Sequence, residues 1–295
     1  MTTPNNDIKN TVAVSGVTGF LGKELVGLLE DSGQIVMPIT REDIEGDVEK
    51  LAEKIEGVGA LFNFAGEPVF QRWTSKAKKR ILDSRVNTTR KLVEAVELMN
   101  EKPKMFFSAS AVGIYDIYEV HDEFSSVYDK TFFAEVCTAW EREAMKLYGK
   151  YGIRLIIGRL GVVLGRSGGA FPIIKKAMQF GVGNKIGDGF QSFPFIHIAD
   201  LLSAIWYLWK KSTCTGVFNI VAPQLLSNYE FADAMINVSG KKPITNVPLW
   251  VLKAGLGEGV EIFTKGQKVL PNRLKEENFH FLFPDITSAL EDLMK

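Results

Sequence analysis

Short apolar runs alternate with amphipathic segments through the first half of the chain. The runs are bounded by turn-forming or charged residues, as is typical of strands buried inside a sheet. The segments between them carry apolar residues three or four positions apart, which is typical of helices packed on one face. We predict strands at Val12–Ser15, Ile35–Ile39, Ala60–Phe64, Met105–Ser108 and Leu155–Arg159. We predict helices at Phe20–Asp31, Val48–Ile55, Ser75–Met99 and Phe132–Tyr151.

This alternation predicts an α/β fold, a Rossmann-type doubly wound parallel sheet with helices on both faces. After Gly161 the rhythm changes to a glycine-rich stretch that also contains Pro172 and Pro194. A helix, a strand and a helix are expected to follow, at Asp200–Lys211, Val217–Val221 and Tyr229–Val238. We expect residues 10–165 to form the Rossmann domain, with returning segments near 190–222. Residues 166–295 are expected to form a smaller C-terminal α/β lobe over the ligand.

Three glycines mark the passage from the first predicted strand into the first turn of the first predicted helix, in the order Gly16, Gly19 and Gly22. Glycines at such a turn let the backbone approach a diphosphate, and the helix start offers free N–H groups and a positive dipole end. The position of the motif, between a strand and a helix, favours a dinucleotide site over an ordinary turn. The expected contacts are Gly16, Thr18, Gly19, Phe20, Leu21 and Gly22.

Thr40 and Arg41 follow the second strand, about twenty residues after the glycine turn. An acidic residue near this point would bind the ribose 2′-OH of NAD, whereas a basic residue suits the 2′-phosphate of NADP. Arg41 therefore favours NADP(H), and the Rossmann domain is predicted to bind it. Glu42 and Asp43 come next, and a shift of one residue would place an acid there. A solvated surface arginine is the alternative.

Small and polar residues end the next three strands, at the edge where such sheets bind ligands. The third strand leads into Asn63, Phe64, Ala65 and Gly66, which would let a ribose or nicotinamide approach the backbone. The fourth ends near Ser108 and Ser110, and a Ser110 hydroxyl is placed to bond a substrate oxygen. Leu160 follows the fifth strand, and its backbone is expected to contact the nicotinamide amide. Plain strand-to-loop turns and serine caps are the alternatives.

Composition narrows the class of protein. The chain has 295 residues, 46% of them hydrophobic, and 35 basic and 35 acidic residues that give zero net charge. A neutral chain is not expected to bind nucleic acid or anionic lipid. The apolar stretches are too short for a membrane span, and the polar start lacks a secretory signal. Two cysteines do not form a disulfide framework, so a reduced cytoplasmic location is expected, and the two cysteines and three histidines show no metal-ligand spacing, so no metal is expected.

A series of motifs carries a family resemblance almost from end to end. The chain resembles the extended short-chain dehydrogenases/reductases, which include sugar-nucleotide epimerases. More narrowly it is similar to an atypical branch, the epimerase family proteins, which end in a C-terminal domain of unknown function. The motifs are Gly16–Gly22, Asn63–Pro68, Arg72–Trp73, Ser84–Arg85, Trp140–Glu141, Arg159–Gly165, Gly168–Ala170, Gly187–Gln191, Ile196–Asp200, Gly266–Pro271 and Phe279–Phe281.

The chain departs from the wider superfamily at its catalytic residues. The resemblance implies a Tyr-x-x-x-Lys pair on the helix after the serine strand, whose lysine lowers the pKa of the tyrosine. Cys137 stands at the tyrosine position and Glu141 at the lysine position. An acid there would raise the pKa of a neighbouring thiol, and we expect Cys137 to be a buried helix residue. Arg85 replaces an asparagine of the preceding helix, so only Ser110 remains.

Arg85 and Ser110 are therefore the candidate catalytic residues. Arg85 would donate to a cofactor phosphate or ribose, or to an anionic substrate, and Arg80 is a second candidate of this kind. The alternative for Arg85 is an ion pair with Asp83 or Glu141. His197 is expected to bond a backbone group in a strand or loop. Asp200 is expected to cap the helix that follows it.

Three functions fit these residues. The first is an NADP(H)-dependent oxidoreductase or epimerase with a non-standard proton donor, acting on an unknown small molecule. The second is a binding protein without turnover, such as a sensor of the redox ratio or a regulatory partner. The third is an isomerase or lyase that holds its cofactor tightly. Fold resemblance does not choose between them. A homodimer formed through the long helices is expected by analogy.

Overall fold

The computed structural model describes residues 10–295, apart from the side chains of Asn184 and Val247. Within that range a six-stranded parallel sheet forms the centre, in the order β10-β6-β4-β3-β1-β2. Its strands are β1 (Thr11–Ser15), β2 (Ile35–Ile39), β3 (Ala60–Asn63), β4 (Met105–Ala111), β6 (Arg154–Leu160) and β10 (Gly216–Ile220). The strand order reverses beside β1, and ligands of such sheets bind at that point.

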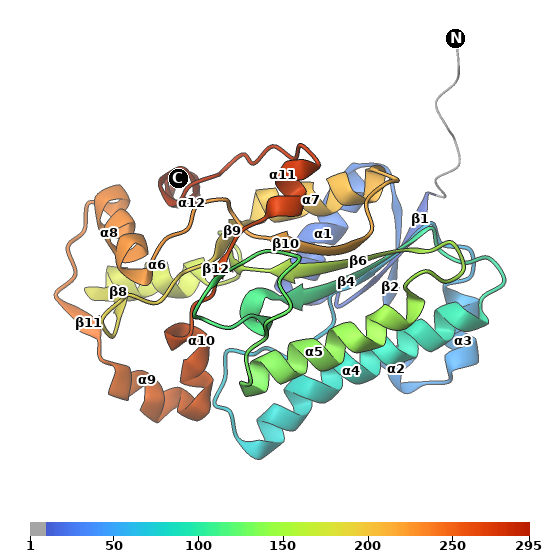
Figure 1. Cartoon of the computed structure of the whole chain (residues 1–295), viewed down its shortest axis with the longest axis horizontal. Helices are drawn as coiled ribbons and strands as arrows, with labels where there is room; N and C mark the ends of the chain where they lie inside the picture. The colour runs from blue at the N-terminus through green and yellow to red at the C-terminus, as the bar shows by residue number, and fades with distance from the viewer. Residues whose placement is uncertain (1–9) are drawn as a thin grey trace, which may run out of the picture.

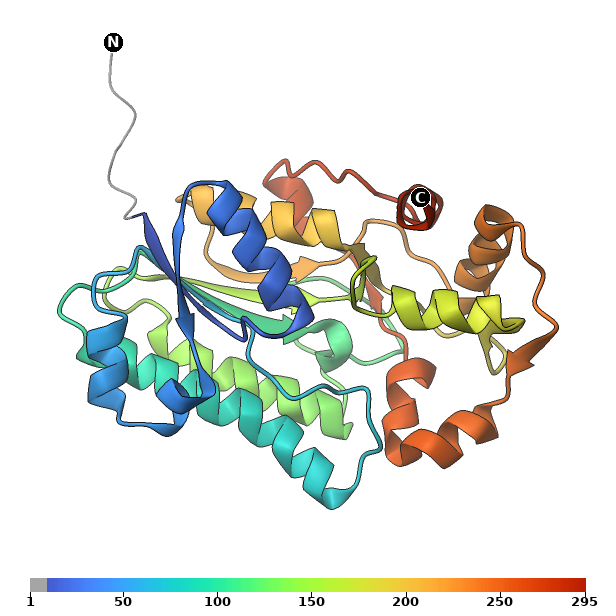
Figure 2. The same ribbon diagram turned by 180° about the vertical axis from the view of Figure 1, so that it is seen from behind.

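Helices cover both faces of this sheet, as Figures 1 and 2 show. One apolar core joins the sheet to α1 (Phe20–Asp31) and α7 (Ile198–Lys210). A second core, on the other face, joins it to α3 (Val48–Lys54), α4 (Ser75–Leu98) and the segment that follows α5 (Phe132–Ala144). The expected Rossmann-type architecture is therefore confirmed.

A smaller group of elements lies beyond the carboxyl ends of the strands. Its core is formed by apolar residues of α6, α8, α12 and the segments between them. The elements of this region are β7 (Val162–Leu164), α6 (Phe171–Gln179), β8 (Val182–Ile186), β9 (Phe195–His197), α8 (Asn228–Ser239), β11 (Thr245–Val247) and α12 (Ile286–Met294). Figure 1 shows this group beside the sheet, while β10 lies within the sheet itself.

The segment from α9 (Leu249–Leu256) through α10 (Glu261–Thr264) packs against the loop that follows β3. The backbone N–H of Trp73 donates to the carbonyl of Leu256 at 3.1 Å. Arg72 donates to the carbonyl of Ala254 at 2.5 Å. After this segment, β12 (Lys268–Val269) pairs with β5 (Val120–His121), and α11 (Asn272–Glu276) contacts β10.

The largest differences from the expected elements are one helix end, one strand end and one additional helix: β4, predicted to end at Ser108, continues to Ala111. The helix predicted at Phe132–Tyr151 ends at Ala144 and continues as a 3-10 turn at Met145–Leu147. Gly149 and Gly152 follow with φ of +69° each, a conformation that ends a helix although the apolar spacing continues. A short helix, α2 (Arg41–Glu45), was not predicted. Within residues 10–295 no helix is long and apolar enough to cross a membrane.

Candidate functional site

The glycine turn has the geometry that a diphosphate requires. Gly16 has a φ of +79°, and a Cβ there would lie 2.7 Å from the backbone of Phe64. A Cβ on Gly22 would lie 2.1 Å from the carbonyl oxygen of Gly16, so α1 packs directly on the turn. Gly19 is the N-cap of α1, where no side chain accepts a hydrogen bond from the first turn. The N–H groups and positive dipole end of α1 thus remain available to an anion.

Two other predicted contacts lie on this turn in different environments. Thr18 is exposed, as is Gly19 beside it. The Phe20 ring packs against the glycine loop after β7, where a Cβ on Gly165 or Gly168 would lie 2.6 or 2.4 Å from it. Phe20 therefore offers a ligand its backbone, while its ring holds the second region against α1.

Arg41 is an exposed cation at the end of β2. Thr40 caps α2: its hydroxyl accepts the N–H of Asp43 at 3.3 Å and donates to that carboxylate at 2.7 Å. Asp43 also binds Lys54 at 2.6 Å, which directs this acid into the helix. The Arg41 side chain is 83% exposed, and its ion pair with Glu45 is long, at 3.9 Å. Arg41 is thus available for a 2′-phosphate.

Asn63 links two strands to α4 beneath the site. Its Oδ1 accepts the Ser15 hydroxyl at 2.7 Å, and its Nδ2 donates to Thr89 Oγ1 at 2.8 Å. All three side chains are buried. Phe64 stacks on Phe107, with ring centroids 5.4 Å apart. The side chain of Asn63 thus belongs to the framework, and beyond it Ala65 is half-buried and Gly66 is exposed.

Arg85 lies directly against Gly66. A Cβ on Gly66 would be 2.9 Å from Arg85 Cζ, so glycine makes room for the guanidinium. One nitrogen, Nη1, donates to the carbonyls of Glu67 and Ile81 at 3.0 and 3.1 Å. The buried Nε has no hydrogen-bond partner among the described residues. Neither of the ion pairs weighed for Arg85, with Asp83 or Glu141, is formed.

The guanidinium of Arg80 already forms hydrogen bonds with side chains of the loop after β3. Its Nε donates to Glu67 at 3.2 Å, and its Nη2 donates to Gln71 at 2.9 Å. The side chain is 46% exposed. These contacts stabilise the loop after β3, which itself contacts Arg85 through the Glu67 carbonyl.

Ser110 belongs to a buried polar network that centres on an ion pair. Its hydroxyl donates to Glu141 Oε1 at 2.6 Å. Arg159 binds both oxygens of the same carboxylate, through Nε at 2.8 Å and Nη2 at 2.7 Å. The side chain of Arg159 is only 2% exposed and that of Glu141 10%. The Glu141 carboxylate is therefore paired with a cation from β6.

Tyr115 joins the network from the turn after β4. Arg159 donates to its hydroxyl at 2.7 Å, and this hydroxyl lies 2.9 Å from Asn219 Oδ1. Burial raises the pKa of Tyr115 to about 12, although Arg159 acts in the opposite direction. This tyrosine was missed because no lysine follows it at the family spacing. Its position depends on contacts 44 and 104 residues apart in the chain.

Cys137 is fully buried, as expected. Burial and, to a smaller extent, the Glu141 carboxylate raise the pKa of its thiol to about 12. The thiol thus stays protonated at neutral pH, and acts neither as a nucleophile nor as an acid.

The remaining candidates lie in or directly after strands of the sheet and in α7. Ser108 is buried in the middle of β4, which continues to Ala111, and Leu160 is buried at the end of β6. His197 caps α7 and accepts the N–H of Ala199 at 3.1 Å, so it bonds a backbone group as expected. The expectation that Asp200 caps this helix was wrong: Asp200 accepts the N–H groups of Leu282 and Phe283 at 2.7 and 2.9 Å. Its place inside the first turn of α7 directs the carboxylate to a distant loop.

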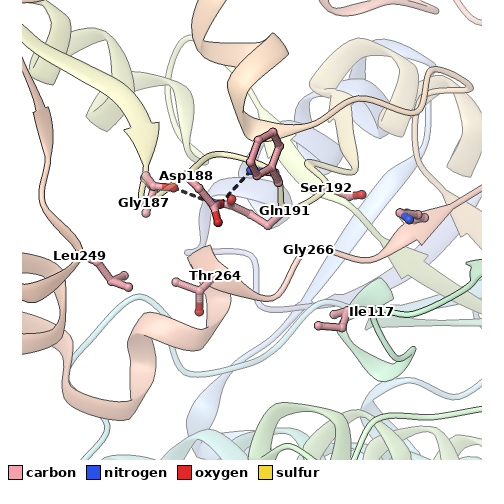
Figure 3. A pocket seen from close by; sticks show the side chains of 11 residues that line it. Ile117, Gly187, Asp188, Gln191, Ser192, Leu249, Thr264 and Gly266 are labelled. Carbon is pink, nitrogen blue, oxygen red and sulfur yellow. Dashed lines mark hydrogen bonds between the residues drawn. The ribbon is translucent and has the colours of Figure 1, made fainter.

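A cavity of about 430 Å³ is lined by residues of the second region, of the segment from α9 to β12, and of the loop after β4 (Figure 3). Ile117, shortly after Tyr115, lines one wall. Lys268 lines another and is followed by Val269, which packs with Tyr115 and Cys137. The cavity is therefore close along the chain to Tyr115 and to the residues that pack with it, while the side chains of the Ser110 network are buried and do not line it. Among residues 10–295 no group of three or more His, Cys, Asp or Glu side chains is placed to hold a metal ion.

Comparison with known proteins agrees with this geometry. Residues 12–220 match the NAD dependent epimerase/dehydratase family, and residues 247–293 match a domain of unknown function, DUF1731. An epimerase family protein of Staphylococcus saprophyticus is 33% identical over 293 residues, which cover 95% of this chain and 98% of that protein.

Two solved structures are similar as well. The human epimerase family protein SDR39U1, crystallised with NADPH, has a TM-score of 0.88 at 32% identity, covering 96% of this chain and 98% of that one. A nucleoside-diphosphate sugar epimerase from Corynebacterium glutamicum has a TM-score of 0.76 at 28% identity, covering 95% of this chain and 57% of that one. The chain therefore belongs to the NAD dependent epimerase/dehydratase family, within the extended short-chain dehydrogenases/reductases, and ends in a DUF1731 domain.

Proposed function

We propose that this protein binds NADP(H) and uses it as an oxidoreductase on a small molecule. The observation that carries the proposal is the pairing of the uncapped start of α1 with the exposed Arg41. The first suits a diphosphate and the second suits a 2′-phosphate. The NADPH in the crystal structure of the similar human protein supports this choice of cofactor.

We assign each part of the cofactor to a different group of residues. Gly16, Gly19 and Gly22 would hold the diphosphate, and Arg41 the 2′-phosphate. The spare donors of Arg85, beside Gly66, suit a ribose or nicotinamide oxygen near the strand ends. When bound, the cofactor supplies or accepts a hydride.

Ser110 and Arg85 are the groups that we assign to the substrate oxygen. The hydrogen of Ser110 is directed to Glu141, so its oxygen offers lone pairs and accepts a hydrogen bond. Arg85 carries the positive charge that the missing lysine does not supply, and it would stabilise negative charge that develops on the substrate. The Glu141–Arg159 ion pair keeps Ser110 in this orientation.

A binding protein without turnover is the second candidate. The observation that favours it is the chemistry at the family's proton-donor position, where the Cys137 thiol has a pKa of about 12 and no exposure. Such a protein would retain the glycine turn and Arg41 without a proton donor. Both candidate functions require NADP(H) binding, so only a measurement of turnover distinguishes them.

The cofactor is tested by the substitution Arg41→Ala. We expect NADPH affinity to fall about tenfold or more, because a phosphate loses its charge-assisted partner, while NADH affinity stays the same. Calorimetric titration of both dinucleotides measures this. Arg142→Ala is the matched control, since Arg142 is an exposed arginine on α5. Equal losses for NADPH and NADH would remove Arg41 from the site.

The reaction is tested on protein that has retained or been loaded with NADPH. Loss of NADPH fluorescence when a carbonyl compound is added supports the oxidoreductase. NADPH that stays bound and reduced through a broad panel of carbonyl compounds favours the sensor.

A further inference from the structure

The cavity near Tyr115, lined by Ile117 and Lys268 among others, has a distinctive set of side chains. Four separate segments line it: the loop after β4, the end of β8 with the turn that follows, the start of α9, and the stretch from the end of α10 to the start of β12 (Figure 3). Its apolar lining consists of Ile117, Ile186, Phe190 and Leu249, and Phe190 is largely exposed. Its uncharged polar lining consists of Gln191, Ser192 and Thr264.

The charges in the lining cancel. Asp188 and Lys268 are the charged side chains that line the cavity in the described part of the chain. Asp188 accepts the N–H of Phe190 at 3.1 Å within a tight turn, which leaves its charge in place. The neighbouring Lys265 is paired with Asp129 at 3.7 Å, so it adds no net charge.

The neutral polar groups are partly committed to the backbone. Gln191 donates to the carbonyls of Ile186 and Phe263 at 3.1 and 3.0 Å, and so joins β8 to α10. The Thr264 hydroxyl donates to the carbonyl of Val260 at 3.3 Å, so it and the Gln191 amide oxygen can accept a hydrogen bond from a hydroxyl group, while the Ser192 hydroxyl can donate or accept. The cavity thus offers hydrogen bonds and apolar contact without excess positive charge.

This balance distinguishes between classes of substrate. A nucleoside diphosphate carries at least two negative charges, and proteins bind such groups with several basic side chains, most often arginine. A single lysine opposed by an aspartate does not offset the loss of hydration of two phosphates. An uncharged molecule has no such requirement.

We propose that this cavity holds the substrate, and that the substrate is a small uncharged carbonyl or hydroxyl compound with an apolar body. The inference rests on the proposed function, because it names the substrate class of the same site. It also separates this chain from the similar C. glutamicum protein, which is described as a nucleoside-diphosphate sugar epimerase.

The test uses the NADPH-loaded protein and two probes that differ in charge more than in size, 4-(hydroxymethyl)benzaldehyde and 4-carboxybenzaldehyde. UDP-glucose is the third probe. Binding is measured from the rise in Tm with probe concentration, so it does not depend on turnover. We expect the uncharged aldehyde to bind about fivefold or more tightly than the carboxylate, and UDP-glucose to leave Tm unchanged.

Two variants test whether the lining sets this preference. Asp188→Asn keeps an oxygen acceptor for the Phe190 N–H and removes the negative charge, so carboxylate binding should approach that of the uncharged probe. Lys268→Met should weaken the carboxylate about fivefold further and leave the uncharged probe unchanged. Lys76→Met, an exposed lysine at the start of α4, is the control and should change neither.

Several results would overturn the proposal. They are tighter binding of the carboxylate or of UDP-glucose, no Tm response to the uncharged aldehyde, or a preference that neither variant alters. Failure of the proposed function is seen separately, as absence of NADPH binding before any probe is added. An aldehyde that binds in this pattern without consuming NADPH supports the cavity and favours the sensor over the oxidoreductase.

Discussion

At the scale of single residues, the buried ion pair of Glu141 and Arg159 is the centre of the site. Glu141 lies buried with Arg159, and the carboxylate of this pair accepts the hydrogen bond of the Ser110 hydroxyl. A buried carboxylate is stable only with hydrogen bonds and a compensating charge, and Arg159 supplies both. The same cation also contacts the hydroxyls of Tyr115 and Tyr128, at 2.7 and 3.0 Å. The guanidinium of Arg159 thus holds three side chains in place: the Glu141 carboxylate and the hydroxyls of Tyr115 and Tyr128.

We expect Arg159→Met to lower the free energy of unfolding by about 3 kcal/mol, because it leaves the Glu141 carboxylate buried without its partner. Urea unfolding measures this change. The double variant Arg159→Met with Glu141→Leu should recover a large part of the loss, since it removes both charges. Arg166→Met, at an exposed pair with Asp292, should cost less than about 1 kcal/mol. A double variant as unstable as the sum of its two single variants would contradict this account.

At the scale of elements, α1 and the turn before it act as one unit. The predicted range of this helix, Phe20–Asp31, agrees with the structure at both ends. Apolar spacing identified the helix, and the glycines identified its start. The C-terminal end of α5 was predicted seven residues too late, at Tyr151 instead of Ala144. There the apolar spacing persists while two left-handed glycines turn the backbone.

Gly22→Ala tests the contact between α1 and the turn. The added Cβ would meet the Gly16 carbonyl oxygen at 2.1 Å, which cannot be relieved without moving the backbone. We expect the free energy of unfolding to fall by about 2 kcal/mol, and NADPH binding to weaken as the turn shifts. Thermal unfolding and calorimetric titration measure the two effects.

Gly27→Ala is the matched control on the same helix. A Cβ at Gly27 has no neighbour within 4 Å, so alanine should raise the free energy of unfolding by about 0.5–1 kcal/mol. NADPH affinity should not change. If Gly22→Ala were as stable as Gly27→Ala, close packing at the turn would not explain why glycine stands there.

At the scale of the whole molecule, the chain returns from the second region to cover the ligand edge of the sheet. The segment from α9 to α10 contacts the loop after β3 through Arg72 and Trp73, and a Cβ on Gly259 would lie 2.8 Å from the Gln71 carbonyl oxygen. The same segment supplies Leu249 and Thr264 to the cavity. The segment from α9 to α10 therefore contacts both the proposed substrate cavity and the loop after β3, which lies beside the proposed cofactor site.

Arg72→Ala should loosen this contact without unfolding the sheet. We expect faster amide hydrogen exchange in residues 249–264, because the Ala254 carbonyl loses its arginine donor, and unchanged exchange in the central strands. Lys76→Ala, nearby and exposed, should leave both regions unchanged. Unchanged exchange in residues 249–264 of Arg72→Ala would show that other contacts hold the segment.

Local pattern determined the strands, α1 and the glycine turn, because spacing of apolar residues and freedom of the backbone act over a few neighbours. It therefore predicted the Rossmann-type fold and the diphosphate position. It also predicted that Cys137 is buried and that an acid beside it raises the pKa of the thiol.

The tertiary structure alone decided how the polar side chains pair. Ser110, Glu141 and Arg159 meet across 31 and 18 residues of chain, and the cavity is assembled from four segments. Sequence spacing does not predict contacts between residues so far apart in the chain, because these contacts depend on which strands are neighbours in the sheet and on which buried charges pair. The glycine turn was readable from the chain, whereas the partner of Glu141 became visible only once β6 lay beside β4.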